Sequence, residues 1–397
     1  MRSSVILRTE RGSFRILSEI GRGGAAIIYK AETVSADRQV PQVVAIKVLH
    51  QHLHRNPEFR QRLTNEFRLM QRLPSRHIPR VYGHGENFIV MELLQGPSLA
   101  HLIHGSELLT LEQALDLLFQ IAAVIRDLYE HRVLHRDLKP SNLILARERV
   151  IKLLDFGIAL DLEKEESLQE GFLGSPPYVA PERTGLLETG SNVRDVRSEL
   201  YAFGVMAFEL FTRQLPFDGE TVWSILRAHV TNPVPSLGAL RADLPDRVVR
   251  LIEMCLAKEP YERCQTPQEL SNLICEAGEK ACLCAPRDSR VFFPIFKSHV
   301  IVGRDDPRYD HFPDIDISAL DVGLHTSRLH ASVFQTGGKW AIQELSHVRN
   351  GTWLNGERLS PGMIVPLNHR DEISLANIKL VFSLPEHSDG EKEPKLC

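Results

Sequence analysis

The chain has 397 residues, of which 43% are hydrophobic and 25% are charged, an ordinary composition for a globular protein. Its formal net charge of −4 excludes a bulk attraction to nucleic acid or to an anionic membrane surface, so we expect no nucleic-acid partner. No apolar run reaches the roughly 18 residues that a membrane span needs, and no such span is expected.

The cysteines and the first residues bear on the cellular compartment. The spacing of the six cysteines matches no four-ligand zinc pattern, and Cys282 and Cys284 are only two positions apart. We therefore expect reduced thiols. The segment Met1–Arg8 has too short an apolar run for a signal peptide. Together these features predict a cytoplasmic protein.

Strands around a glycine turn are predicted near the start of the chain. The segment from Phe14 to Leu49 contains Gly21-Arg22-Gly23-Gly24 and then the β-branched run 42–49, which has the composition of a buried strand. Between Asn56 and Leu73 the apolar residues recur at spacings of three and four. This pattern predicts an amphipathic helix, which Pro74 ends.

Beyond Glu92 the apolar pattern becomes helical. Helices are predicted over 111–129, 200–211, 220–229 and 245–256, and the second of these is apolar nearly all round, as in a buried helix. A strand-rich segment followed by a helix-rich segment predicts two lobes.

The last quarter of the chain has a different pattern. After a composition shift near 282–288, short strands are predicted over 300–302, 331–334, 340–342 and 378–382, separated by turn dipeptides such as Asn355-Gly356. This pattern is typical of a small all-β sandwich. The polar tail over 385–397 is expected to be disordered.

One constellation of residues indicates phosphoryl transfer. This chemistry needs positioning and charge neutralisation more than covalent participation by the protein. The run His135-Arg136-Asp137-Leu138-Lys139-Pro140-Ser141-Asn142 is followed by Asp155-Phe156-Gly157. Asp137 is the candidate that orients or deprotonates an acceptor hydroxyl, and Lys139 is placed to neutralise the transferring phosphate. Asn142 and Asp155 offer hard oxygen atoms to Mg²⁺.

The upstream parts of such a site also occur in the expected order. Gly21 and Gly23 would let the backbone approach phosphates without obstruction. Lys47 lies in a buried strand and therefore needs an ion partner. Glu66, on the following helix, is the preferred partner, whereas Glu58 lies too near the start of that helix.

With these motifs, the segment from about residue 14 to 275 resembles a eukaryotic-type serine/threonine protein kinase. Gly174-Ser175-Pro176-Pro177-Tyr178-Val179-Ala180-Pro181-Glu182 resembles the end of an activation segment, and Arg263 stands where kinases place the arginine that pairs with Glu182. Lys139 and Ser175 resemble the serine/threonine class rather than the tyrosine class. Met91 resembles the residue that precedes the adenine-binding hinge.

The resemblance implies ATP and Mg²⁺ as cofactors and assigns roles by position. The catalytic residues would be Asp137, Lys139 and Lys47, and the metal ligands would be Asn142 and Asp155. The nucleotide would contact Ile20, Gly21, Gly23, Gly24, Ile28, Ala45, Lys47, Glu66, Glu92, Leu94, Asn142 and Asp155.

Two residues depart from the kinase pattern. The position of the third glycine of the loop is occupied by Ala26, and Glu199 stands where the family usually has the Asp that braces the catalytic loop.

A third feature concerns activation. Arg136 precedes Asp137, and the loop that follows Asp155 is acidic, with Ser167 its only hydroxyl before Gly174. We therefore hypothesise that a glutamate of this loop pairs with Arg136 and gives basal activity without phosphorylation; the candidates are Glu163, Glu165, Glu166 and Glu170.

Three motifs over residues of about 293–384 together resemble a forkhead-associated (FHA) domain. They are Gly303-Arg304, Ser327-Arg328-Leu329-His330 and the run from Asn350 to Gly356. The resemblance implies that Arg304, Ser327, Arg328 and Asn350 bind a phosphothreonine peptide, with Gly303, His330 and Asn355 mainly architectural.

The sequence thus predicts a bilobal α+β kinase fold over 14–275, a linker over 276–292 and an all-β sandwich over 293–384. The expected function is an ATP- and Mg²⁺-dependent protein kinase that phosphorylates Ser and Thr of proteins and recruits phosphothreonine-containing partners. This architecture resembles bacterial signalling enzymes. The alternative is a weakly active scaffold, for which Ala26 and Glu199 are the only support.

Overall fold

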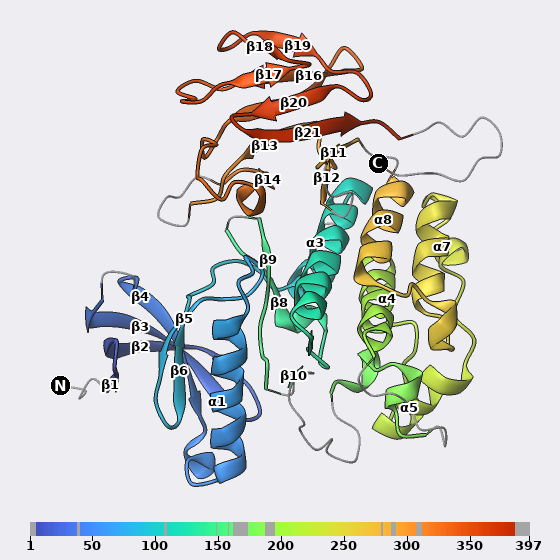
Figure 1. Cartoon of the computed structure of the whole chain (residues 1–397). Helices are drawn as coiled ribbons and strands as arrows, with labels where there is room; N and C mark the ends of the chain where they lie inside the picture. Colours follow the sequence, from blue (N-terminus) through green and yellow to red (C-terminus); the bar gives the residue numbers. More distant parts are fainter. Residues whose placement is uncertain are drawn as a thin grey trace. The chain divides into compact units, whose positions relative to one another are not determined.

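The computed structural model describes residues 5–37, 40–106, 109–147, 149–157, 159–161, 174–186, 195–278, 281–286, 291–306 and 312–385. They fall into two compact units, whose elements are labelled in Figure 1. The first unit comprises Met1–Leu108, Gln120–Asp243 and Ile252–Leu270, and the second comprises Leu109–Phe119, Leu244–Leu251 and Ser271–Cys397.

The first unit begins with a six-stranded antiparallel sheet in the order β1-β2-β3-β4-β6-β5. Its buried face packs around Phe14, Ile46 and Val90. Helix α1 (Pro57–Arg72) lies beside β5 and β6, and its first turn is capped by Asn56, whose side chain accepts a hydrogen bond from the Glu58 N–H. The strands are β1 (Ile6–Thr9), β2 (Gly12–Arg22), β3 (Ala26–Ala36), β4 (Val43–Leu49), β5 (Val81–His84) and β6 (Phe88–Met91).

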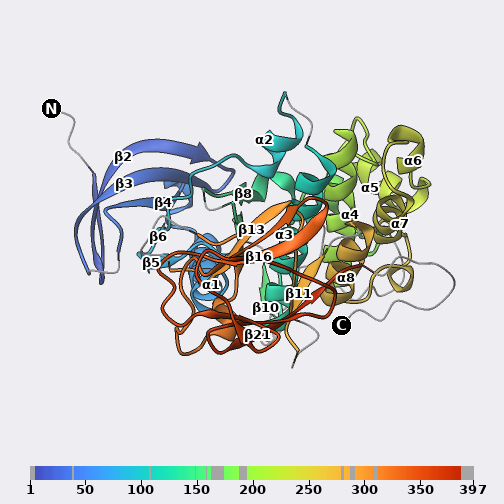
Figure 2. The ribbon, with the colours of Figure 1, turned by 90° about the horizontal axis from the view of Figure 1, so that it is seen from above.

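Helices dominate the following part of the chain, as predicted. α4 is buried from Ser198 to Phe211, and α6 packs beside it (Figure 2). Two short two-stranded antiparallel sheets, β8 with β9 and β7 with β10, carry the loops of the candidate site. The helices are α2 (Leu99–Ile103), α3 (Leu111–Glu130), α4 (Arg197–Thr212), α5 (Val222–Thr231), α6 (Leu237–Leu240), α7 (Asp246–Cys255) and α8 (Pro267–Gly278). The short strands are β7 (Val133–Leu134), β8 (Leu143–Leu145), β9 (Ile151–Leu153) and β10 (Leu160–Asp161). Single-turn 3₁₀ helices cover Gln51–Leu53, Pro140–Asn142, Pro176–Tyr178, Pro181–Arg183, Pro260–Glu262 and Ser318–Leu320.

The second unit contains the β-sandwich. One sheet has the strand order β12-β11-β21-β20-β17-β18 and the other has the order β14-β13-β15-β16-β19. The two sheets bury a common apolar core, in which the rings of Trp340 and Phe382 meet edge to face at 5.9 Å. The strands are β11 (Cys282–Cys284), β12 (Phe292–Pro294), β13 (His299–Gly303), β14 (Ile315–Asp316), β15 (Ala331–Thr336), β16 (Lys339–Glu344), β17 (Thr352–Leu354), β18 (Glu357–Arg358), β19 (Ile364–Pro366), β20 (Glu372–Leu375) and β21 (Ile378–Ser383).

The start of the sandwich differs from the predicted boundary. Residues 276–292 were expected to form a linker, but α8 continues to Gly278 and β11 pairs with β21 along its whole length. Leu283 of β11 is part of the sandwich core. Cys282 and Cys284, on the other face, form a separate apolar cluster with Cys275 and Phe292, against which Phe119 packs. The predicted disordered tail, by contrast, lies almost wholly outside the described residues.

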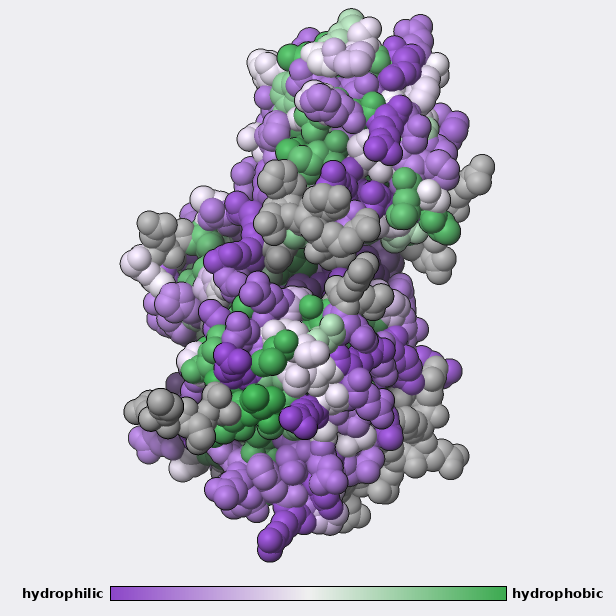
Figure 3. Space-filling view, turned by 90° about the vertical axis from the view of Figure 1, so that its left-hand side faces the viewer, coloured by the Kyte–Doolittle hydropathy of each residue, from purple (hydrophilic) through white to green (hydrophobic). Residues whose placement is uncertain are grey.

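The surface carries no extensive apolar region on the face seen in Figure 3, which is mostly hydrophilic with small hydrophobic areas. On the first sheet the exposed apolar side chains include Ile6, Leu17, Ile20 and Val34. None of the helices in the described part of the chain has the length and hydropathy to cross a membrane.

Buried His229 on α5 generates a prediction about stability and pH. Its ring is fully buried against Tyr201 and Phe217, and burial lowers its pKa to about 4. An unfolded chain takes up this proton near pH 6.5, as is usual for histidine, so the folded state loses stability as the pH falls from about 6.5 to 4.

We expect this one group to account for about 3 kcal/mol of that loss. His229→Gln should therefore flatten the dependence of the unfolding free energy on pH in this window, as measured by denaturant unfolding at several pH values. His101→Gln, at an exposed position on α2, serves as the control. Equal slopes for the two variants would contradict the prediction.

Candidate functional site

The Lys47 ammonium lies between two carboxylates. Its Nζ atom is 2.7 Å from Oε1 and 2.8 Å from Oε2 of Glu66, and 2.9 Å from Oδ1 of Asp155. Lys47 lies on β4 and Glu66 on the buried side of α1, while Asp155 follows β9. The predicted ion pair between Lys47 and Glu66 is therefore present. Glu58, the alternative partner, instead pairs with Arg62.

This contact fixes the charge of the groups involved. Burial alone would lower the pKa of the Lys47 ammonium, but Glu66 and Asp155 outweigh it and raise that pKa above its ordinary value. The charge of Lys47 in turn lowers the pKa of Asp155 to about 2. Both groups are thus charged at neutral pH.

The glycine turn joins β2 to β3. The Gly23 N–H donates to the carbonyl of Ala26 at 2.8 Å, and a ring nitrogen of His50 bonds the Gly23 carbonyl at 2.8 Å. A Cβ added at Gly24 would meet no atom within 4 Å, so the space beside this turn is open. Ala26, which replaces the third glycine, is the buried first residue of β3. The contact from His50 was not predicted, because no sequence pattern marks it.

The predicted hinge follows β6. Met91 is buried at its end, and Ala45 of β4 pairs with it across the sheet. The Glu92 side chain is engaged by Lys152 at 2.9 Å, which fixes the segment. Among the described residues, none donates to the Glu92 carbonyl or bonds the backbone of Leu94. Those groups remain available to a ligand.

Asp137 lies in a cluster of polar contacts at the loop between β7 and β8. Its Oδ2 atom is 2.6 Å from Lys139 Nζ, and its Oδ1 atom accepts a hydrogen bond from Ser175 Oγ at 2.8 Å. Lys139 also donates to Ser175 at 2.8 Å. Asn142 Nδ2 donates to the Asp137 carbonyl at 2.9 Å. From the sequence, Ser175 indicated only the acceptor class; its contact with both charged groups was not predicted.

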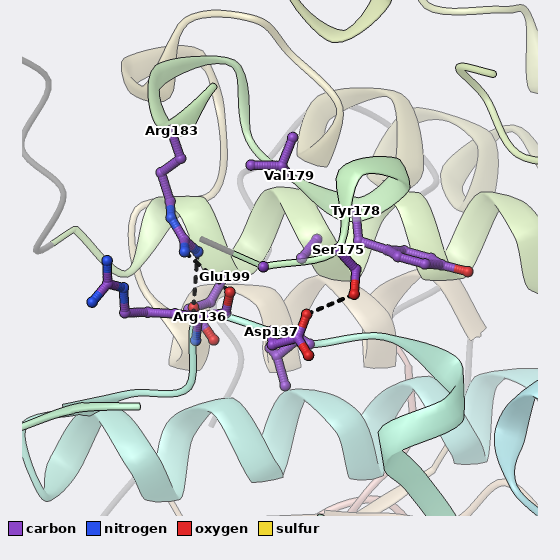
Figure 4. Close-up of a pocket in the computed structure, with 10 residues that line it drawn as sticks. Arg136, Asp137, Ser175, Tyr178, Val179, Arg183 and Glu199 are labelled. Atoms are coloured by element: carbon purple, nitrogen blue, oxygen red, sulfur yellow. Dashed lines mark hydrogen bonds and ion pairs between the residues drawn. The ribbon is translucent and has the colours of Figure 1, made fainter. Parts of the chain in front are cut away.

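The backbone beneath Asp137 is unusual. Arg136 adopts a left-handed conformation with φ of 70°, and its N–H donates to Oε1 of Glu199 at 2.9 Å. Figure 4 shows the Arg136 side chain pointing away from that contact. No carboxylate among the described residues forms an ion pair with this side chain. The acidic residues proposed to pair with it, Glu163 to Glu170, lie outside the described residues.

The end of the activation segment is anchored by a buried ion pair. Arg263 donates to both carboxylate oxygens of Glu182 at 2.8 Å, as predicted. The arginine side chain is fully buried, and its remaining donors reach the carbonyls of Arg197, Ala257 and Lys258. All five N–H donors of the guanidinium thus have an acceptor, which offsets the cost of burying it.

The sandwich loops place the other predicted residues. Arg304 follows β13, and its Nε atom donates to the carbonyl of Thr326 at 3.3 Å. The Ser327 hydroxyl accepts a hydrogen bond from the Arg349 N–H at 3.4 Å, next to Asn350. Asn350 donates to the carbonyl of His325 at 2.8 Å. Arg304, Ser327 and Asn350 thus come from three loops that contact one another, and half-buried Arg328 follows Ser327.

The residues expected to be architectural hold these loops. A Cβ at Gly303 would lie 1.9 Å from the carbonyl oxygen of Arg328, so only glycine fits. Buried His330 accepts from the Ser327 N–H at 3.1 Å and bonds the carbonyl of Gly351 at 2.8 Å. Asn355 links Asp371 and the Glu372 N–H, each at 2.9 Å.

Comparison with known proteins fits the geometry of the first unit. A model of the protein kinase domain matches residues 14–273. The chain belongs to the protein kinase family. Kinases of this family use ATP and a divalent metal ion, and this kinase supplies suitable donors. The amide nitrogen of Asn142 is taken up by Asp137, which leaves its Oδ1 atom for another partner, and the side chain of Asp155 is 52% exposed.

No cluster of three or more His, Cys, Asp or Glu side chains among the described residues could hold a metal by itself. Mg²⁺ bound to a nucleotide does not need one, because it takes one or two protein oxygens and completes its shell with phosphate oxygens and water. Asn142 and Asp155 therefore fit the group that the family implies.

Several bacterial kinases are similar to this one. The serine/threonine-protein kinase PrkC of Bacillus subtilis is 33% identical over 289 residues, which cover 72% of this chain and 42% of PrkC. The probable serine/threonine-protein kinase PknB of Lactococcus lactis is 32% identical over 263 residues, or 65% of this chain and 40% of that protein. The serine/threonine-protein kinase pkn2 of Myxococcus xanthus is 34% identical over 281 residues, or 67% and 32%. The kinase thus spans less than half the length of these relatives.

The second unit also matches a family model. That of the FHA domain covers residues 300–376, which contain the three predicted motifs. The kinase therefore carries a C-terminal FHA domain, whose sandwich extends beyond the matched residues to β11 and β21.

The buried pair of Glu182 and Arg263 generates a prediction about stability. Arg263→Met leaves the Glu182 carboxylate buried without its partner and should lower the free energy of unfolding by about 3–5 kcal/mol. Denaturant unfolding measures this change. Arg15→Met is the control, because Arg15 forms an exposed pair with Glu32 whose loss should cost at most about 1 kcal/mol. A similar loss in the two variants would refute the prediction.

Proposed function

We propose that this chain transfers the γ-phosphoryl group of ATP to Ser and Thr hydroxyls of proteins, with Mg²⁺ as the metal ion. The observation that carries the proposal is the contact of Lys47 with both Glu66 and Asp155. This contact brings the predicted phosphate-binding lysine and a predicted metal ligand into one ion cluster, as a kinase requires for phosphoryl transfer.

Each residue has a role that follows from its position. Lys47 neutralises phosphate charge, and Asn142 and Asp155 hold the metal ion. Glu92 and Leu94 offer backbone groups to adenine, while the open turn at Gly21, Gly23 and Gly24 covers the phosphates. Ile20, Ile28 and Ala45 are the apolar members of the proposed nucleotide site, and Glu66 holds Lys47.

At the acceptor end, Asp137 orients the Ser or Thr hydroxyl of the substrate and accepts its proton. The contact of Asp137 with Ser175 supports this role, because a hydroxyl already lies at hydrogen-bonding distance from the carboxylate. Lys139 adjoins the same carboxylate and supplies positive charge where negative charge develops on the transferring group. ATP supplies the phosphoryl group when bound.

The activity can be tested by transfer of radiolabel from γ-labelled ATP to a generic protein substrate. Asp137→Ala should reduce the rate by a factor on the order of 10²–10⁴, because the acceptor loses its base. Asp246→Ala, at an exposed position on α7, should leave it unchanged. Equal labelling by the wild type and Asp137→Ala would overturn the proposed kinase activity and favour a scaffold function.

We further propose that the FHA domain binds phosphothreonine peptides of substrates or partner proteins through Arg304, Ser327, Arg328 and Asn350. The proximity of guanidinium, hydroxyl and amide groups on adjoining loops supports this role, since such donors recognise a phosphate. Asp306 lies 3.8 Å from Arg304 Nη1, so the phosphate competes with a carboxylate for part of the guanidinium.

Arg304→Ala should weaken binding of a phosphothreonine peptide roughly 10–100-fold, because a charge-assisted hydrogen bond is lost. Titration of a fluorescent peptide measures the affinity, with its unphosphorylated form as a reference. Lys339→Ala removes an exposed positive charge at the start of β16, which pairs with the last residue of β15, and should have no effect. If Arg304→Ala bound as tightly as Lys339→Ala, phosphate recognition by Arg304 would be excluded.

A further inference from the structure

Arg136, the residue before Asp137, is held on both of its backbone groups. Its N–H donates to Oε1 of Glu199 on α4 at 2.9 Å. Its carbonyl accepts a hydrogen bond from Nη2 of Arg183 at 3.0 Å. Arg183 comes directly after Glu182, at the end of the activation segment. Figure 4 shows its side chain reaching down from that segment to Arg136 and Glu199.

Both side chains that hold Arg136 are buried. The side chain of Arg183 is 7% exposed and that of Glu199 is 3% exposed, and Nη1 of the arginine lies 3.8 Å from Oε1 of the glutamate. The second carboxylate oxygen of Glu199 is buried without a hydrogen bond from any described residue. Among the described residues, the ion pair that this carboxylate forms is with Arg183.

The same carbonyl is also approached by Gly174, at the other end of the described activation segment. Gly174 has φ of 119°, and a Cβ there would lie 2.9 Å from the carbonyl oxygen of Arg136. The next residue, Ser175, donates to the carboxylate of Asp137. Residues 174–183 thus contact the catalytic loop at two successive residues.

A left-handed conformation is uncommon for a residue such as arginine and persists only where its surroundings hold it. At Arg136 the holding groups are one carboxylate and one guanidinium, which reach opposite ends of the residue. Loss of either leaves a backbone group of the catalytic loop without its partner. The Arg136 carbonyl carbon is bonded to the amide nitrogen of Asp137, and that nitrogen is bonded to the Cα that carries the Asp137 side chain. The direction of the Asp137 side chain therefore depends on the conformation of Arg136.

We propose that Arg183 is a positioning residue that acts together with Glu199, and that its guanidinium compensates for the Glu that replaces the usual Asp. Arg183 holds the carbonyl that precedes Asp137, and the longer carboxylate at position 199 lies near its positive charge. This inference rests on the proposed kinase activity. It extends that activity by naming a group that touches neither ATP nor the acceptor.

The first test compares Arg183→Met with Arg241→Met. Arg241 is a matched control in the same lobe, because it also donates to a backbone carbonyl, that of Phe211, and pairs with a carboxylate, that of Asp243. We expect kcat of Arg183→Met to fall roughly 10–100-fold, with KM for ATP within about twofold of the wild type, because the nucleotide contacts lie elsewhere. A kcat equal to that of Arg241→Met would overturn the proposal.

A second pair of variants covers the case in which Arg183→Met fails to fold. Arg183→Lys and Glu199→Gln each weaken the same contact with small changes in volume. If the two residues act together, kcat of the double variant should be no lower than kcat of the less active single variant. Losses in kcat that multiply in the double variant would show that the residues act independently.

A third measurement does not depend on activity. Hydrogen–deuterium exchange of peptides that contain Arg136 and Asp137 should be roughly tenfold faster in Arg183→Met than in Arg241→Met. Unchanged exchange would refute the brace itself. In the same set, label transfer by the wild type no greater than by Asp137→Ala would refute the kinase activity instead, so the two failures are distinguishable.

Discussion

The Lys47 ammonium cannot be buried on β4 without an anion, and the geometry of the candidate active site depends on how that requirement is met. Glu66 supplies one carboxylate from α1 and Asp155 supplies another from the loop after β9. The helix, the sheet and the loop that carries the proposed metal ligand Asp155 therefore have to take one relative arrangement. The same contact keeps Asp155 ionised, which a metal ligand of this type requires.

Other buried charges in the first unit follow the same rule and hold successive segments of the chain. Glu182 and Arg263 connect the end of the activation segment to the loop before α8, and Glu199 and Arg183 hold the loop that carries Asp137. A buried ion pair contributes little net stability compared with apolar packing, but removal of one partner is costly. Such pairs are thus better suited to fixing geometry than to raising stability.

The elements and residues that have strong local signals were predictable from the sequence. The apolar spacing between Asn56 and Leu73, together with Pro74, predicted α1, and that helix in turn indicated Glu66 as the partner of Lys47. The contact of Arg183 with Glu199 was not predictable, because neither residue has a periodic pattern and the contact forms only when α4 is packed. Strand β11 was also missed, since three residues with two cysteines give no alternation to detect.

Strand β11 has a consequence for dissecting the protein. It lies between β12 and β21 in its sheet, and Leu283 contributes to the sandwich core. A fragment that began at Phe293, the boundary suggested by composition, would lack this strand. Strand β21, the longer of the two neighbours of β11, would then present a row of unpaired backbone groups to solvent. An open edge of this kind recruits strands from other molecules. Self-association of such a fragment would reflect the missing strand and not a property of the intact kinase.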